Sequence, residues 1–454
     1  MPDDPTALCA VDAARAMRER RLGCLDYTRS LLRLIDAREP QVQAWEHLDR
    51  PQALADAHAI DEAIARNDAS GALLGVPVGI KDIIDVRGMP TADGTVLHAG
   101  RIADADAALV RAMRRAGAWP IGKTVTTELA TYAPGKTRNP HDIEHTPGGS
   151  SSGSAAAVAC GMVPLAIGTQ TNGSVIRPAS FCGVVGYKPS FGRIARAGVL
   201  RQSPMLDQMG VFARNVEDAA TLAQALFGPD PADPATALSP MPPLAAIAVQ
   251  PPPTPLRLAW ARTPWWERVA PDARAAFEQW VETFRDETQA LDAGIEPIDL
   301  PAEAEHAVAW LRTLMEADIA ASYEREYDTG RAQLSESLQR QIERGRAITA
   351  VDYRKAIENR DRVAAALDPF FERFDAIACP ATLGTAPLVC QGTGDPLMCT
   401  LWTYVGAPAI SLPLLRGANR LPLGVQLVAR HGDDARLLRT ARAIMRRAID
   451  HDRG

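Results

Sequence analysis

The amino-acid sequence predicts an α/β protein with a mixed central β-sheet, helices on its flanks and an additional helical insertion. Short apolar runs bounded by Gly and Pro begin at about residue 73, as in LLGVPVGIKDIIDV, and such Val- and Ile-rich runs are typical of buried strands. The stretch DADAALVRAMRRAGAWPIGKT then places an amphipathic helix before a short buried strand. FDAIACP, APAISLPL and LPLGVQLVAR resemble strands again after a charged helical block. Together these runs predict one sheet with an insertion.

The order of the segments follows from the same patterns. In ALCAVDAARAMRERR and YTRSLLRLIDAR, apolar residues recur every three or four positions, which predicts helices near the N-terminus. Between 229 and 255 the high proline content predicts a surface excursion without helix or sheet. Helical spacing returns over 271–293 and 303–368. The predicted segments are an N-terminal helical segment (1–70), a core (71–228), the Pro-rich excursion (229–255), a helical insertion over the site (256–374) and a return to the core sheet (375–454).

Composition argues against several classes of protein. The 454 residues carry a net charge of −6 without a long run of one sign, so neither a nucleic acid nor a membrane surface is expected as partner. The acidic N-terminus lacks the apolar core of a signal peptide, and no apolar run approaches the ~18–20 residues of a membrane span, so a cytoplasmic location is expected. Seven scattered cysteines include no CxxC pair, and we expect neither disulfides nor a metal site.

The Gly- and Ser-rich run TPGGSSSGS at 146–154 has three interpretations: a flexible linker, a phosphate-binding loop or the wall of an active site. It leads directly into AAAVACGMVPLAIG, an Ala-rich helix and a buried strand, which disfavours a linker. We expect Ser152 or Ser154 to cap that helix. No GK[ST] follows, so a phosphate-binding loop is disfavoured as well.

Two further elements accompany this run. Ser174 lies in the tight turn GTQTNGS behind a strand, where successive backbone N–H groups can point at an oxyanion. Lys81 ends the apolar run of GVPVGIKD, although burying an ammonium group is costly. Taken singly, Ser174 is equally an ordinary turn serine, and Lys81 is better explained as a strand-end lysine that reaches solvent or pairs with Asp82.

Together the three elements resemble the amidase signature hydrolases. That family has a Lys after a GVP-type strand, a GGSS(G/S)GSAAAVA loop, and a GTDTGGS turn followed by FCGVVGxKP, and all three occur here in the same order. Ser174 also follows Ser150 at the distance in sequence that the family shows. The resemblance is strong over about 70–225 and looser over about 375–430.

The resemblance implies a mechanism and a set of roles. Ser174 would be the nucleophile, Ser150 a bridging serine after a cis peptide bond, and Lys81 the base. Burial beside residues such as Val78 and Ile80 would lower the pKa of Lys81, so that a neutral amine could take a proton through Ser150. No cofactor is required. The candidates for the oxyanion hole are the backbone N–H groups of Thr171, Asn172, Gly173 and Ser174.

The sequence departs from the family pattern beside the nucleophile. Gln170 replaces the usual Asp, Asn172 replaces a Gly, and Arg177 lies three residues after Ser174 where many members have it at two. Because Gln170 and Asn172 are neutral, the site wall is expected to carry less negative charge. Substrate details of one subfamily therefore do not transfer directly to this chain.

We expect the substrate to be a small, neutral and fairly apolar amide, with anilides, aryl carbamates (urethanes) and esters as related substrates. ELATYAP, SPMLDQMG and LWTYVG supply apolar and aromatic side chains with few cations to hold a carboxylate, although any one of these side chains is as readily core. Two alternatives stay open: a glutaminase subunit of a tRNA-dependent amidotransferase, and an inactive binding protein on the same fold. A monomer or homodimer is expected. The predicted substrate-binding residues are Leu129, Tyr132, Gln170, Met205, Leu206, Met209, Trp402 and Tyr404.

Overall fold

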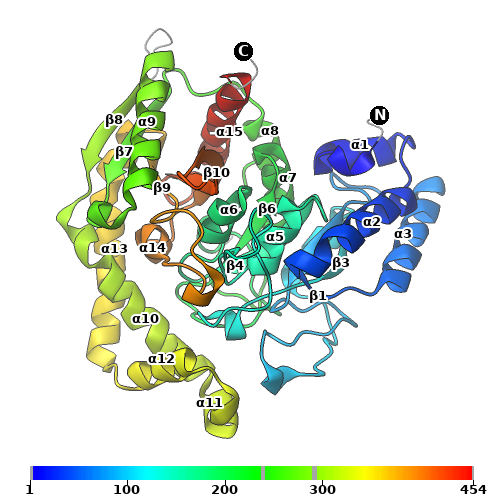
Figure 1. Ribbon diagram of the computed structural model, residues 1–454, viewed down its shortest axis with the longest axis horizontal. Coiled ribbons are helices and arrows are strands. Elements are labelled where there is room, and N and C mark those ends of the chain that lie inside the picture. The colour runs from blue at the N-terminus through cyan, green and yellow to red at the C-terminus, as the bar shows by residue number, and fades with distance from the viewer. Residues whose placement is uncertain (1–3, 237–240, 289–293, 452–454) are drawn as a thin grey trace.

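A computed structural model of the chain describes residues 4–236, 241–288 and 294–451, and its strands form one mixed sheet (Figure 1). The order across the sheet is β1-β3-β2-β4-β6-β5-β10-β11-β9-β7-β8. The strands are β1 (Trp45–His47), β2 (Pro77–Lys81), β3 (Trp119–Thr124), β4 (Leu165–Gln170), β5 (Val185–Lys188), β6 (Gln208–Ala213), β7 (Arg257–Arg262), β8 (Gly294–Asp299), β9 (Ala376–Pro380), β10 (Ala409–Arg416) and β11 (Pro422–Val428). The expected mixed α/β fold is confirmed.

The α-helices occupy most of the remaining described chain. They are α1 (Ala10–Arg18), α2 (Cys24–Val42), α3 (Arg50–Ala65), α4 (Ala108–Arg115), α5 (Ser152–Ala159), α6 (Ile176–Cys182), α7 (Val216–Leu226), α8 (Leu244–Ala248), α9 (Pro271–Thr288), α10 (Ala307–Ser322), α11 (Glu324–Gly330), α12 (Glu336–Arg346), α13 (Ala350–Arg373), α14 (Leu397–Tyr404) and α15 (Asp434–His451). Figure 1 shows α1–α3 on one side of the molecule and α9–α13 on the other.

The sheet is buried on both faces, and neighbouring residues of one strand belong to different cores. On β4, Leu165 and Ile167 pack in the larger apolar cluster, whereas Ala166 packs in the second cluster with the alanines of α5. The same alternation recurs on β6, where Phe212 faces α5 and its neighbours face the other way. This period of two is the geometry of a pleated strand, and it places the apolar run of β4 at the centre of the protein.

The parallel pairing of the central strands brings their carboxyl ends together. β2 pairs in parallel with both β3 and β4, so Lys81 at the end of β2 and the turn after Gln170 at the end of β4 lie at the same edge of the sheet. In α/β proteins, ligands bind outside the carboxyl ends of the strands. The topology therefore places the Lys81 and Ser174 regions next to each other.

Helix α5 begins one residue earlier than it would if Ser152 were its N-cap residue. The hydroxyls of its serines donate hydrogen bonds to backbone carbonyls outside the helix. Ser151 is the N-cap residue, and it makes no side-chain capping bond. Ser152 Oγ donates to the Val125 carbonyl, and Ser154 Oγ donates to the Ile167 carbonyl. The expectation that Ser152 or Ser154 caps the helix is therefore wrong. Buried backbone carbonyls need donors, and these two hydroxyls supply them.

The segment 256–374 is not purely helical. It contributes β7 and β8, which add to the sheet edge beyond β9, before the helices that the spacing predicted. The Pro-rich excursion contains the short helix α8, which packs against α7 and α15. Parts of both predicted segments, 237–240 and 289–293, lie outside the described residues. Runs of six residues carry too little periodicity to be separated from their helical surroundings.

The two helices α10 and α12 pack so closely that their backbones touch. A Cβ atom at Gly345 of α12 would lie 2.0 Å from the carbonyl oxygen of Glu316 on α10. Only glycine allows this approach. The pair also contacts α14 through α10, and Figure 1 shows α10, α12 and α14 on the same side of the molecule.

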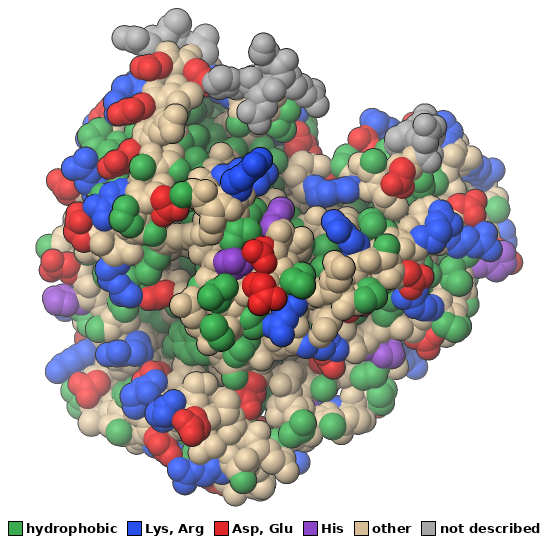
Figure 2. All heavy atoms as spheres, viewed as in Figure 1, with side chains coloured by type: hydrophobic (Ala, Val, Ile, Leu, Met, Phe, Trp, Pro, Cys, Tyr) green, Lys and Arg blue, Asp and Glu red, His purple; other side chains and the backbone are tan. Residues whose placement is uncertain are grey.

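The face drawn in Figure 2 carries basic and acidic side chains interspersed over helices and loops. Among the described residues, no helix combines the length and the apolar composition needed to cross a membrane.

Candidate active site

Lys81 is wholly buried and is hydrogen-bonded to two hydroxyls. Its Nζ donates to Ser150 Oγ at 2.7 Å and to Thr169 Oγ1 at 2.7 Å. It does not pair with Asp82, because that carboxylate binds Lys123 at 3.0 Å. Lys81 therefore neither reaches solvent nor pairs with its neighbour, and the alternative explanation of this residue is wrong.

Burial lowers the pKa of Lys81 well below its ordinary value, and the negative charge of Asp207 opposes this only in part. Desolvation disfavours the charged amine because no carboxylate bonds to it directly. A neutral Lys81 at moderate pH is the protonation state that a general base requires.

The loop that carries Ser150 is held by groups from several elements. The Gly149–Ser150 peptide bond is cis, as the resemblance implied. Arg177 Nη2 donates to the Gly149 carbonyl at 2.7 Å, and its Nη1 donates to the Gly394 carbonyl at 2.9 Å. Ser151 Oγ donates to the Thr169 carbonyl at 3.1 Å. These bonds fix Ser150 against the end of β4.

Gln170, one of the residues that depart from the family pattern, holds the turn 171–175 in place. Gln170 Oε1 accepts from the backbone N–H groups of Val175 and Ile176, at 2.8 and 3.0 Å. Its Nε2 donates to Thr403 Oγ1, which in turn donates to the Asn172 carbonyl at 2.6 Å. An amide can accept and donate at once, so Gln170 links both ends of this turn to α14 without adding charge.

Ser174 lines a narrow cavity of ≈ 20 Å³, here called the inner cavity. All four predicted oxyanion-hole residues line it as well, together with Arg177 and Tyr132. The structure therefore brings Ser174 and the predicted donors to one small space.

A second, larger space of ≈ 330 Å³, here called the outer cavity, shares four lining residues with the inner cavity: Tyr132, Asn172, Met315 and Pro396. Its walls come from one face of α10, one face of α12 and the start of α14. The α10 face contributes Val308, Leu311, Arg312, Met315 and Glu316, and the α12 face contributes Ser337, Arg340, Gln341 and Arg344. Residues at this spacing lie on one side of a helix.

Of the eight predicted substrate-binding residues, Tyr132 lines both cavities and the other seven line neither. Leu129, Leu206, Met209, Trp402 and Tyr404 are buried core residues, and Gln170 acts inside the turn. Met205 accepts a hydrogen bond from Arg360 through its carbonyl. Apolar residues beside a motif pack into the core more often than they line a pocket. The three arginines that line the outer cavity come from α10 and α12, outside the three segments that were expected to carry few cations.

Sequence reasoning missed Thr169 and the whole wall formed by α10 and α12. Thr169 directly precedes Gln170, which replaces the Asp usual in the family. The Thr169 hydroxyl is one of the two hydrogen-bond partners of Lys81. The i, i+3, i+4, i+7 spacing of Ser337, Arg340, Gln341 and Arg344 was visible in the sequence. A polar helix face is usually solvated, however, and only the fold shows that this one lines a cavity.

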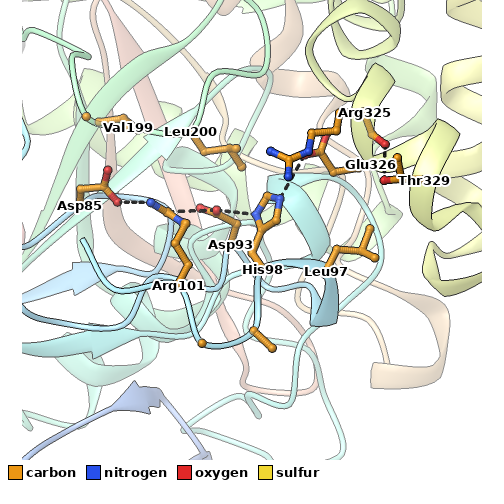
Figure 3. A pocket seen from close by; sticks show the side chains of 13 residues that line it. Asp85, Asp93, Leu97, His98, Arg101, Val199, Leu200, Arg325, Glu326 and Thr329 are labelled. Atoms are coloured by element: carbon orange, nitrogen blue, oxygen red, sulfur yellow. Dashed lines mark hydrogen bonds and ion pairs between the residues drawn. The ribbon is translucent and has the colours of Figure 1, made fainter. Parts of the chain in front are cut away.

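Another cavity, of ≈ 660 Å³, lies between the loop 85–101 and α11 (Figure 3). Its ionic side chains pair with one another: His98 bonds to Asp93 at 2.8 Å and to Glu326 of α11 at 3.1 Å, and Arg101 bridges Asp85 and Asp93. The carboxylates raise the pKa of His98. This network joins the inserted helices to the core and contains none of the residues around Lys81.

His141 and His145 have an HxxxH spacing that the sequence reasoning overlooked. His141 Nε2 contacts the Cys182 carbonyl at 2.9 Å, whereas His145 Nδ1 pairs with Asp142 at 3.0 Å. Within the described parts of the chain, no group of three or more His, Cys, Asp or Glu is arranged to hold a metal ion.

Removing the hydroxyl of Thr169 is expected to weaken the site without changing its surroundings. In Thr169→Val, Lys81 Nζ loses one of its two partners, so the amine is less well positioned against Ser150. We expect the rate of Ser174 labelling by a fluorophosphonate to fall about 10- to 100-fold, in the range of a lost catalytic hydrogen bond. Thr169→Ser should restore most of the rate. Equal labelling of the valine variant and the wild type, across the pH range, would exclude this positioning role.

A mixed α/β sheet with a buried lysine bonded to a serine, beside a second serine in a narrow cavity, is an arrangement that suits a Ser–Lys variant of the catalytic triad. The chain belongs to the Amidase family, whose model matches residues 26–438, and it is an enzyme of the kind that acts on carbon–nitrogen bonds.

Known proteins similar to this chain fall into two groups. The curated relatives include glutamyl-tRNA(Gln) amidotransferase subunits from Chloroflexus aggregans (34% identical, 97% of this chain and 96% of the relative) and from Koribacter versatilis (32%, 96% and 97%). Similar solved structures include the peptide amidase from Stenotrophomonas maltophilia (29% identical, TM-score 0.84, 98% of each chain). Another is a structure described as a vestigial protein complex that reveals the origins of an s-triazine catabolic enzyme (28%, TM-score 0.89, 97% and 98%).

Proposed function

We propose that the protein hydrolyses the carboxyl–nitrogen bond of small neutral amides through an acyl-enzyme on Ser174. The observation that carries the proposal is the buried, hydrogen-bonded Lys81–Ser150 pair at the strand edge where the Ser174 turn also lies. Binding alone has no need for a buried lysine bonded to a serine at the strand edge that also carries the Ser174 turn. This disfavours an inactive protein on the same fold.

In the proposed reaction, neutral Lys81 takes a proton from Ser150 while Ser150 takes the proton of Ser174. Ser174 Oγ then bonds to the carbonyl carbon, and the carbonyl oxygen becomes an oxyanion facing the backbone N–H groups of 171–174. The C–N bond breaks as the leaving nitrogen receives a proton back through Ser150. Water, deprotonated by the same route, attacks the acyl-enzyme and releases the acid and free Ser174.

The choice of a neutral substrate is supported by the state of Arg177. Both terminal nitrogens of this guanidinium bond to backbone carbonyls of the site loops. Two of the three guanidinium nitrogens next to Ser174 are therefore committed to backbone carbonyls, which leaves only Nε for a ligand. Anilines and phenols leave more readily than alkyl amines, so anilides and aryl carbamates should react fastest.

The second candidate is a glutaminase subunit of a tRNA-dependent amidotransferase. It is favoured by the curated relatives, which are named as amidotransferase subunits and match over nearly their whole length. Arg177 also supports it, because this cation has no carboxylate partner within the described chain and its buried Nε lacks a hydrogen-bond acceptor there. A substrate carboxylate would meet both needs.

The two candidates are separated by comparing acetanilide-type substrates with free glutamine and malonamate at equal concentration. We expect kcat/KM for the anilide to exceed that for either charged substrate by at least about tenfold, or ~1.4 kcal/mol of barrier. The measurement is made on the chain alone and with the remaining subunits of an amidotransferase from a curated relative. Glutamine hydrolysis that requires those subunits would establish the second candidate instead.

A further inference from the structure

Gln341 is a buried polar residue of the outer cavity that lacks a partner. It lies on the α12 face that lines this space, and only 3% of its surface is exposed. Its Oε1 has no hydrogen-bond donor within the described part of the protein. Leaving a buried acceptor unpaired costs stability, because the group has lost water without gaining a donor. Such a group in a cavity wall is a candidate for ligand recognition.

The groups beside Gln341 already have partners of their own. Arg344 forms a two-pronged ion pair with Glu316 at 3.0 Å, and this carboxylate is nearly buried. Thr400 donates to Asn172 Oδ1 at 2.7 Å. Arg340 pairs with the exposed Glu336 at 3.3 Å. The ion pair of Arg344 and Glu316 is neutral overall, and Arg344 lies one helical turn from Gln341 on the same face of α12.

Part of the outer cavity is lined by apolar side chains, alongside Arg312 and Glu316 of α10. Val308, Leu311 and Met315 from α10 face it, and Leu397 and Pro396 close it beside α14. A ligand that extends from Ser174 past Tyr132 and Asn172 therefore meets hydrocarbon first. On the α12 side of this space, the side-chain amide of Gln341 carries an oxygen that lacks a donor within the described residues.

We propose that the outer cavity selects substrates with a second carboxamide, separated from the scissile bond by an apolar spacer and bound by the side-chain amide of Gln341. This inference rests on the proposed amide hydrolysis and names its substrate class. A primary amide both donates and accepts, so it can pair with the C=O and N–H of a secondary amide together. A rotation of about 180° around the terminal torsion of Gln341 exchanges its amide oxygen and nitrogen, so either atom can face the ligand.

The test uses a short series of p-nitroanilides whose acyl chain ends in an N-methylcarboxamide, each with a matched ethyl ketone that keeps the carbonyl and replaces the N–H by CH2. A second series carries the same two end groups on the aniline side. In at least one series we expect kcat/KM for the amide to exceed that for the ketone about tenfold, or ~1.4 kcal/mol. Protection of Ser174 from fluorophosphonate labelling reports the same preference without turnover.

Gln341→Met keeps the volume of the side chain and removes its polar atoms. We expect this variant to reduce the amide-to-ketone ratio to within about twofold, while its melting temperature is unchanged or higher, because an unsatisfied buried group has been removed. The matched control is Gln333→Leu, which changes an exposed glutamine outside both cavities and should keep the tenfold ratio.

The possible results distinguish a failure of the Gln341 role from a failure of the proposed hydrolysis on Ser174. Ratios near one across both series, or a ratio that survives Gln341→Met, would overturn the role of Gln341 while hydrolysis itself stands. A marked loss of stability in Gln341→Met would show a structural partner and would also overturn it. Absence of both hydrolysis and Ser174 labelling would instead refute the proposed function.

Discussion

Ser174→Ala is expected to reduce turnover of every amide substrate by at least about 10⁴-fold, the scale seen when a nucleophile is removed from a catalytic triad. The alanine variant lacks the oxygen that attacks the carbonyl, whereas the inner cavity and its backbone donors stay in place. Turnover should fall in kcat, with substrate affinity largely retained. The measurement is steady-state hydrolysis of an anilide, together with equilibrium binding of the same compound.

Mass spectrometry locates the adduct that the wild type forms with a fluorophosphonate. Ser151 and Ser152 are the nearby controls, since both bond to backbone carbonyls of neighbouring strands or loops. Ser151→Ala should keep the adduct on residue 174. An adduct on any other residue, or normal turnover by Ser174→Ala, would falsify the assignment of the nucleophile.

Lys81→Arg is expected to be as inactive as Ser174→Ala. Arginine keeps the positive charge and cannot give up its proton at any working pH, so it cannot act as a base. In the wild type, kcat/KM should rise from acidic to mildly alkaline pH as Lys81 loses its proton. Because burial lowers the pKa of Lys81, the rise should occur well below the pH at which an exposed lysine titrates. Near-wild-type turnover by Lys81→Arg would exclude this role.

The pH dependence of stability gives an independent check on Lys81. Its pKa is lower in the folded chain than in the unfolded chain, so between these two values the unfolded state binds more protons and stability rises with pH. The unfavourable contribution is greatest below the folded pKa and disappears as pH rises past the unfolded pKa. The free energy of unfolding of Lys81→Met, relative to wild type, should therefore be highest at low pH and fall as pH increases. A flat difference would mean that Lys81 is not desolvated.

Long motifs made the core and the position of Lys81 predictable from sequence. The motif places Lys81 at the end of a buried strand. The pairing of β2 with β4 then determines which side chains lie next to it. The sequence could not reveal that Asp82 binds Lys123, because these two residues lie far apart in the chain. It also could not separate core from pocket among Leu206, Met209 and Trp402. All are apolar, and only packing decides which side chains face an opening.

The close contact at Gly345 has a consequence for how this protein can acquire new substrates. The proton path lies at the ends of β2 and β4, whereas the outer cavity is shaped by α10 and α12, whose spacing is fixed where the Gly345 backbone meets Glu316. Side chains on the cavity faces of those helices can therefore be exchanged without moving a reacting atom, provided that Gly345 is kept. Divergence by duplication, or a laboratory library, would accumulate its useful changes on these two faces and leave the strand ends untouched.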